Sequence, residues 1–273
     1  MKNIPCTVGI ITLNNEATLE RTLKSLRNFE EIIICDGNST DKTVEIAKKY
    51  GCKVIPQYKS KKKNIRIKDK SKVRNKTINA ATNDWYFYID SDDIASPQLV
   101  KSIHKVCLSK TPKHLIWLVN CKIKLDSKIV KHSASYPDKR VMLIHKSTKA
   151  QFYKSEHEVI RYNTKKYSKE LLKGNMYLCW TKERAGKAYW HKAQSWLERD
   201  FQRIKDLSFK DYLRWGIWFN ITSASMYFLK GLRNHIIYGS KYSMPLTVEF
   251  FRTLYHLKMI FKLTQYKLAK IWN

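Results

Sequence analysis

Residues 85–93 read Trp-Tyr-Phe-Tyr-Ile-Asp-Ser-Asp-Asp, a run of aromatic and β-branched residues followed at once by an acidic cluster. Such a run predicts a buried β-strand. The cluster Asp90-Ser91-Asp92-Asp93 then falls at the carboxyl end of that strand, where carboxylates two positions apart can reach one hard divalent ion. A plain turn is the alternative interpretation, because Asp and Ser favour turns and Pro97 follows shortly after.

The residues before this stretch alternate between strand-like and helix-like segments. Strands are predicted at residues 7–13, 31–36 and 53–55, and helices at residues 17–28, 42–50 and 71–81. Alternation of this kind predicts βαβ units and a mostly parallel sheet. Asp36 ends the second strand just as Asp90 follows the later one. Since ligands of such sheets bind beyond the carboxyl ends of the strands, we expect both acids to face one crevice.

After about residue 110 the strict alternation fades. Further strands are predicted at residues 115–123 and 141–145, and the chain is mainly helical and aromatic-rich from residue 194 onward. The predicted fold is therefore α/β, with a mostly parallel, Rossmann-like sheet flanked by helices. We expect a catalytic domain over residues 1–193 and a helical, basic C-terminal extension over residues 194–273.

The chain of 273 residues carries 53 Lys and Arg against 23 Asp and Glu, a net charge of +30. This excess attracts polyanions: nucleic acid, an anionic membrane or a phosphorylated substrate. Ten Lys or Arg and a single acid lie in residues 59–76, which either guide an anionic ligand or form a solvated loop. A nucleic-acid-binding protein is one alternative function, although this run lacks the interleaved aromatics that stack on bases. Another nucleotide-using enzyme, such as a nucleotidyltransferase, is a second, although the first turn, residues 13–16, has no glycine.

The sequence also predicts a cytoplasmic protein at the inner face of a membrane. Its six cysteines show no metal-site or redox spacing and are expected to be reduced thiols. Neither a signal-peptide core nor a run of about 18 apolar residues is found. Residues 246–273 mix aromatic and basic side chains, which suits either contact with an anionic membrane or packing on the core.

The first hundred residues resemble the family 2 glycosyltransferases, which have the GT-A fold. The matching pieces are TVGIITLNNE at residues 7–16, DGNSTDKT at 36–43, Arg74-Asn75, and DWYFYIDSDD at 84–93. The resemblance implies a nucleotide pocket lined by Thr12, Asn15 and Glu16, with Asp36 at the base and Arg74 at the diphosphate. It also implies that Asp90 and Asp92 are the D-x-D pair, with Asp92 the direct ligand of Mg²⁺ or Mn²⁺.

The chain resembles most the lipopolysaccharide-core β-glucosyltransferase branch, whose His-Glu pair and later strand-ending His align with His157-Glu158 and His191. Asp93 stands where that branch usually has Glu. The branch implies an inverting hexosyltransferase that moves sugar from a UDP-sugar to a glycan or lipid-linked acceptor by metal-assisted direct displacement. A carboxylate must then deprotonate the acceptor, and Glu158 or Glu156 is the expected base. His191 is expected to complete the metal site or to orient the diphosphate.

Overall fold

The computed structural model describes residues 4–154 and 159–272, with side chains to Lys270. The chain divides into two compact units, which are described separately. The sheet unit comprises Met1–Lys122 and Asp138–Cys179, and the helical unit comprises Ile123–Pro137 and Trp180–Asn273. The domain boundary expected after residue 193 stays a prediction.

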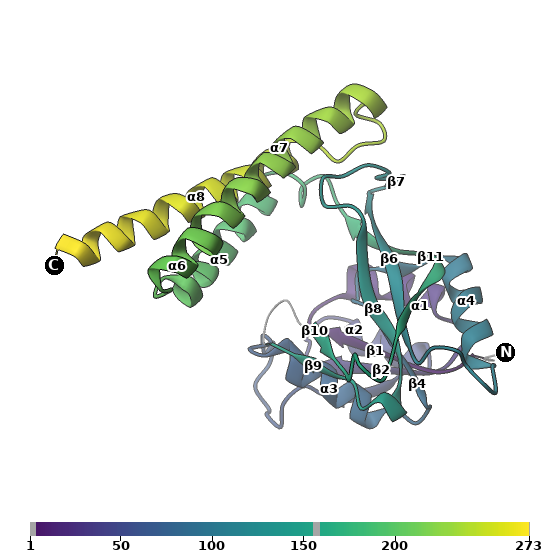
Figure 1. Ribbon diagram of the computed structural model, residues 1–273. Helices are drawn as coiled ribbons and strands as arrows, with labels where there is room; N and C mark the ends of the chain where they lie inside the picture. The colour runs from purple at the N-terminus through teal and green to yellow at the C-terminus, as the bar shows by residue number, and fades with distance from the viewer. Residues whose placement is uncertain (1–3, 155–158, 273) are drawn as a thin grey trace. The chain divides into compact units, whose positions relative to one another are not determined.

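The first half of the sheet is parallel and follows the predicted strands closely. Its order is β3-β2-β1-β4, and each neighbouring pair is parallel. The strands are β1 (Ile4–Thr12), β2 (Phe29–Asp36), β3 (Lys53–Pro56) and β4 (Trp85–Tyr88), joined by α1 (Glu16–Ser25), α2 (Thr43–Lys49) and α3 (Lys70–Ala80). The α/β class is thus confirmed, and the carboxyl ends of β1, β2 and β4 lie at one edge (Figure 1).

The second half of the sheet is antiparallel, unlike the mostly parallel sheet expected. β8 (Asp138–His145) runs antiparallel to both β4 and β6 (Ile116–Leu125), and β11 (Lys169–Trp180) pairs antiparallel with β5 (Ile94–Ala95). β7 (Lys128–Ile129) adds a short antiparallel pairing to β6. The other elements are α4 (Pro97–Cys107), a 3₁₀ turn (Lys146–Thr148), and a separate two-stranded hairpin of β9 (Gln151–Tyr153) and β10 (Val159–Arg161). Strand direction depends on distant pairing, which local patterns do not encode.

Helix α3 is held unusually close to the sheet at Gly9 of β1. A Cβ at this position would lie 2.1 Å from Tyr86 Oη and 2.5 Å from Thr77 Oγ1. These two oxygens are themselves hydrogen-bonded at 2.6 Å, in the buried space that Gly9 leaves. The glycine therefore sets the distance of α3, and with it the position of Arg74, from the strand ends.

The helical unit contains α5 (Lys187–Ile204), α6 (Phe209–Asp211), a π-helical segment (Tyr212–Trp218), α7 (Phe219–Tyr238) and α8 (Leu246–Trp272). α7 and α8 run alongside each other (Figure 1). They approach closely at Gly231, where a Cβ would lie 3.0 Å from Glu249 Cβ. The Glu249 carboxylate is 1% exposed and accepts hydrogen bonds from Ser133 Oγ, the Ala134 amide and Arg252 Nη1.

Helices long and apolar enough to cross a bilayer are absent from the described part of the chain. The six cysteines form no disulfide with one another, and all are buried. Each therefore packs as a small apolar side chain in the interior.

Candidate active site

Two predicted site residues meet at the ends of β1 and β2. Thr12 pairs with Asp36 in the sheet register, and Thr12 Oγ1 donates to Asp36 Oδ1 at 3.0 Å. The Ser39 amide and hydroxyl donate to the same carboxylate at 2.8 and 2.6 Å. Asp36 is only 5% exposed, so these bonds fix the direction in which its carboxylate points.

Asn15 and Glu16 tie the start of α1 to the start of α2. Asn15 Oδ1 accepts from the Leu13 amide at 3.0 Å, which closes the turn after β1. Glu16 Oε2 accepts from the Lys42 amide at 2.9 Å, and the Glu16 amide donates to Asp41 Oδ2 at 3.0 Å. Both side chains therefore shape the two loops beside Asp36, and their contact with a nucleotide stays a prediction.

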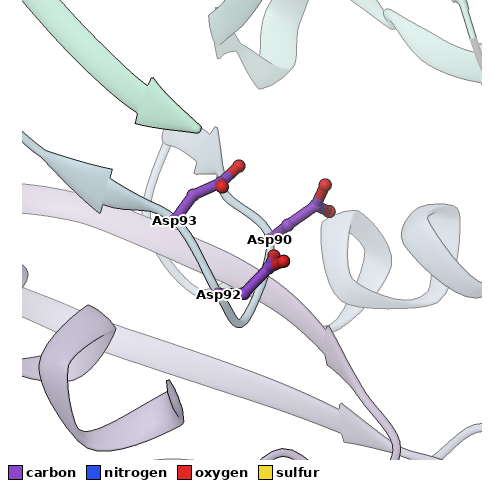
Figure 2. Close-up of side chains that lie close together, drawn as sticks. All are labelled: Asp90, Asp92 and Asp93. Atoms are coloured by element: carbon purple, nitrogen blue, oxygen red, sulfur yellow. The ribbon is translucent and has the colours of Figure 1, made fainter. Parts of the chain in front are cut away.

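Three carboxylates gather on the loop that follows β4. One oxygen of each of Asp90, Asp92 and Asp93 lies within 4.8 Å of the others. Figure 2 shows the three side chains on this one loop. Asp90 and Asp92 are half-buried, and Asp93 is buried. Three such oxygens form a hard donor set that fits Mg²⁺ or Mn²⁺.

Helix α1 holds this loop by its backbone. Thr22 Oγ1 donates to the carbonyl oxygens of Ser91 at 3.0 Å and of Asp93 at 2.8 Å. Thr18 Oγ1 donates to Ser91 O at 3.1 Å, and Arg21 Nη2 donates to Asp92 O at 2.9 Å. Every one of these four bonds ends on a main-chain carbonyl, so none of them uses a carboxylate oxygen of the loop.

Asp93 differs from the other two acids in its surroundings. Burial raises its pKa well above the usual range, and the negative charges of Asp90 and Asp92 raise it further. The Cys179 amide donates to Asp93 Oδ1 at 3.2 Å, which ties the loop to β11. Asp90 and Asp92 are thus the carboxylates of the cluster that reach solvent.

Arg74 of α3 meets the cluster through Asp90. The side chains form an ion pair between Arg74 Nη2 and Asp90 Oδ1. Burial acts to raise the pKa of Asp90, but the charges of Arg74 and Lys70 outweigh it and hold the pKa below the usual range. The guanidinium lies 4.6 Å from the Tyr88 ring centre and 5.6 Å from that of Phe152. Buried between two rings, Arg74 points its charge at the acidic loop.

Asn75 keeps one of those rings in place. The Phe152 amide donates to Asn75 Oδ1 at 2.8 Å, and Asn75 Nδ2 donates to the Phe152 carbonyl at 3.0 Å. This pair of bonds attaches β9 to α3. The predicted Arg74-Asn75 motif therefore has two different tasks in the structure: a charge beside the acids and a clamp on the neighbouring hairpin.

Three predicted site residues remain: Glu156, Glu158 and His191. Glu156 and Glu158 lie outside the described residues. His191 is exposed in α5 of the helical unit, and the expectation that it ends a strand is wrong. Tyr189 and Trp190 look strand-like locally, but they fall in an 18-residue amphipathic helix that begins after Gly186. A metal-binding role for His191 stays a prediction.

Thr18, Arg21 and Thr22 are site residues that the sequence did not lead us to expect. Their spacing of three and four residues places them on one side of α1, next to the predicted leucine stripe. A polar stripe bordering a core-facing one is the signal that could have indicated them. The partner, a row of loop carbonyls some seventy residues away, has no sequence signal.

The part of the chain that carries this geometry is also the part that matches known proteins. Residues 7–113 match the model of Glycosyl transferase family 2. The matched stretch includes Thr12, Asp36, Arg74 and the acidic loop, and it ends before the candidate bases and His191. The predicted resemblance of the first hundred residues to glycosyltransferases is confirmed, while the lipopolysaccharide-core branch stays a prediction.

Similar curated proteins are also glycosyltransferases. The SPbeta prophage-derived glycosyltransferase SunS of Bacillus subtilis (strain 168) is 40% identical over 101 residues, 37% of this chain and 23% of its own. An uncharacterized glycosyltransferase of Rickettsia typhi is 35% identical over 105 residues, 37% of this chain and 32% of its own. The chain thus spans about a quarter to a third of the length of these relatives.

Solved structures show weaker similarity. Staphylococcus aureus TarS 1–349 in complex with UDP-GlcNAc has a TM-score of 0.47 and 14% identity, over 97% of this chain and 92% of its own. Mycobacterium tuberculosis glucosyl-3-phosphoglycerate synthase in complex with Mn²⁺, UDP and glucosyl-3-phosphoglycerate has a TM-score of 0.34 and 24% identity, over 44% of each chain. Both scores are below 0.5, so neither structure assigns a substrate or a site residue to this chain.

Proposed function

We propose that the protein is an inverting glycosyltransferase that moves a sugar from a UDP-sugar to a glycan or glycolipid acceptor. The observation that carries the proposal is the meeting of Arg74 with the acidic loop at the end of β4, inside the stretch that matches family 2. Fixed positive and negative groups at one strand edge suit a nucleoside diphosphate with its cation.

The donor side of the proposal assigns a role to each strand end. Asp36, held by Thr12 and Ser39, accepts hydrogen bonds from the nucleotide base. Arg74 binds the diphosphate, because its guanidinium presents paired donors to phosphate oxygens. Asp92 and Asp90 would hold Mg²⁺ or Mn²⁺, which when bound would supply positive charge to the departing diphosphate. Asn15 and Glu16 shape the turn that borders the nucleotide.

The acceptor side requires a base. The acceptor hydroxyl oxygen forms the new bond to the anomeric carbon from the face opposite UDP, and UDP leaves with the electrons of the broken bond. The hydroxyl proton passes to a carboxylate, which we assign to Glu158 or Glu156. His191 is proposed to assist at the diphosphate or the metal. One displacement of this kind inverts the configuration of the sugar.

The place in the cell where the protein would act depends on the class of acceptor it uses. We propose a lipid-linked glycan acceptor at the cytoplasmic face of a membrane, as in the lipopolysaccharide-core branch, with the basic C-terminal segment contacting anionic lipid. The net charge of +30 supports attraction to such a surface.

The decisive test is Asp92→Ala. UDP release would be measured with a panel of UDP-sugars, with Mn²⁺ or Mg²⁺ and with EDTA. We expect EDTA to abolish release in the wild type, and Asp92→Ala to lower it at least about 100-fold, as loss of transition-state charge stabilisation does. Glu170→Ala removes an exposed carboxylate of β11 and is the matched control. Metal-dependent release that survives in Asp92→Ala would show the proposed function to be wrong.

A further inference from the structure

Helix α7 buries polar and small residues and exposes large apolar ones. Its four buried residues are Asn220, Ala224, Gly231 and Asn234, two amides and two small residues. Nine of its twenty residues are large hydrophobic side chains that are exposed, among them Leu229 (63%) and Ile236 (74%). A helix of a water-soluble domain buries its apolar stripe and exposes its polar one.

The buried polar groups of α7 are satisfied inside the helical unit. Asn220 Nδ2 donates to the carbonyls of Trp215 and Gly216, and Asn220 Oδ1 lies 2.7 Å from His256 Nδ1 of α8. Gly231 allows α7 to lie against Glu249. Small residues and hydrogen-bonded amides between two helices are typical of helix pairs whose outer surface faces lipid.

The exposed side of α7 carries few polar residues, namely Thr222, Ser225 and Arg233. Thr222 Oγ1 is within 3.0 Å of the carbonyls of Trp218 and Phe219, so its hydroxyl is bonded to its own helix. Trp218 (67% exposed) precedes the helix and Tyr238 (41%) ends it, with aliphatic side chains between them. Aromatic residues at both ends of an apolar face suit the interface between water and lipid.

Helix α8 adds a second apolar line. Leu246, Phe250, Leu257, Phe261 and Leu268 are all exposed, by 44 to 61%. Their spacing of four and seven residues places them along one side of the helix. The two helices therefore present exposed apolar stripes from one helical unit.

The positive charge of the surrounding residues favours an anionic lipid surface as the binding partner of these apolar stripes. Residues 209–272 contain ten Lys or Arg and two acids. Of those acids, Glu249 is buried against Arg252, and Asp211 accepts a hydrogen bond from Ser208. A second copy of the chain would bring another net charge of +30 to the same place, which opposes association. An anionic lipid surface attracts the same charges and accepts the apolar side chains.

We infer that the exposed face of α7, flanked by the α8 stripe, inserts into the interfacial layer of an anionic bilayer, with the helix lying in the membrane plane. The inference deepens the proposed membrane location and rests on it. It adds the exposed apolar face of α7 to the contact proposed for the C-terminal segment. Insertion of such faces reaches about 5–10 Å into the headgroup and acyl boundary.

The test uses the full chain and sucrose-loaded vesicles of phosphatidylcholine, with or without 30 mol% phosphatidylglycerol (roughly the anionic share that gives a strongly negative surface). The variant is Trp218→Gln, Leu229→Gln and Ile236→Gln combined, because all three side chains are exposed and Gln keeps helix propensity. The control is Lys61→Gln, Lys62→Gln and Lys63→Gln, which removes exposed charge from the sheet unit. Far-ultraviolet circular dichroism of both variants checks that the helices remain.

We expect the wild type to sediment with the anionic vesicles, with tryptophan fluorescence quenched by brominated lipid. The α7 variant should bind at least tenfold more weakly and lose that quenching, whereas the control should change less than threefold. Equal binding by the α7 variant would overturn the inference. So would a wild type that ignores both vesicles but forms a dimer that the α7 variant dissolves, since a second copy would then cover the face.

UDP release without vesicles, measured on the same preparations, separates this inference from the proposed function. We expect equal release by the wild type and the α7 variant, because α7 holds no proposed donor-site residue. If the wild type releases no UDP from any UDP-sugar but binds vesicles as described, the proposed function fails and the inserted surface stands.

Discussion

Helices α1 and α7, one from each unit, place polar and apolar side chains in opposite ways. In the sheet unit, α1 buries Leu19 and Leu23 completely and turns its charged residues outward. In the helical unit, α7 buries Asn220 and Asn234 and exposes Leu229. The contrast shows that α7, unlike α1, is not held in place by burial of its own large apolar side chains. The helical unit does bury an apolar cluster, contributed by α5, the π-helical segment and α8: Leu197, Phe201, Tyr212, Met259 and Leu263. Beside α7, hydrogen bonds and the buried Glu249–Arg252 ion pair take the place of such a cluster.

The largest effect is expected from a substitution at Glu249, whose side chain lies against α7 at Gly231. We expect Glu249→Ala to lower the free energy of unfolding of the helical unit by about 3–5 kcal/mol, because Arg252 is left buried without its partner. Urea unfolding followed by tryptophan fluorescence measures it, since six of the eight tryptophans lie in the helical unit. Glu249→Gln keeps an acceptor for Ser133 and Ala134 and should cost less. A cost below about 0.5 kcal/mol for the Ala variant would mean that the polar interior does not stabilise this unit.

A matched pair of leucines comes next in size. Leu23→Ala in α1 should cost about 3 kcal/mol of unfolding free energy, because it leaves a cavity in a fully buried site. Leu229→Ala in α7 should cost less than about 0.5 kcal/mol in the absence of lipid, because that side chain is 63% exposed. Urea unfolding by far-ultraviolet circular dichroism gives both values. Equal costs at the two positions would remove the contrast between the two helices.

The smallest effect concerns pH. Burial lowers the pKa of His256 to about 4, below the ordinary value of 6.5, so the unfolded chain binds its proton first as pH falls. Stability is therefore fully present above pH 6.5 and decreases as pH falls towards 4. The loss attributable to this group is about 2 kcal/mol at pH 5. Urea unfolding of the wild type and His256→Gln at pH 7.5 and 5 should show a steeper loss in the wild type; parallel losses would contradict the assignment.

Local patterns predicted the parallel half of the fold well. The strands expected at residues 7–13, 31–36 and 53–55 correspond to β1, β2 and β3, and the helix expected at 71–81 corresponds to α3. These segments carry their own signals: β-branched runs for buried strands, and Asp69, whose side chain caps α3 by accepting from the Lys72 amide. The ends of such strands also determine where Thr12, Asp36 and Asp90 lie, which is why the candidate site could be located in advance.

What could not be predicted depends on contacts between distant segments. The strands expected at 115–123 and 141–145 exist as β6 and β8, but their antiparallel direction is set by pairing with β4. The placement of Phe152 over Arg74 needs the Asn75 clamp, which joins residues 77 positions apart. The reversed polarity of α7 could not be predicted for a different reason: an apolar stripe looks the same in sequence whether it faces a core or its surroundings.

Because α1 holds the acidic loop by its main chain, the bonds between them do not depend on which side chains the loop carries. Thr18 and Thr22 bind carbonyl oxygens, a group that every amino acid supplies. Substitutions at positions 91 and 92 therefore leave these bonds to α1 intact, whereas a substitution at Asp93 also removes the side-chain bond to the Cys179 amide. The main chain therefore fixes the position of the loop, while the side chains at positions 91 and 92 can change without breaking these bonds.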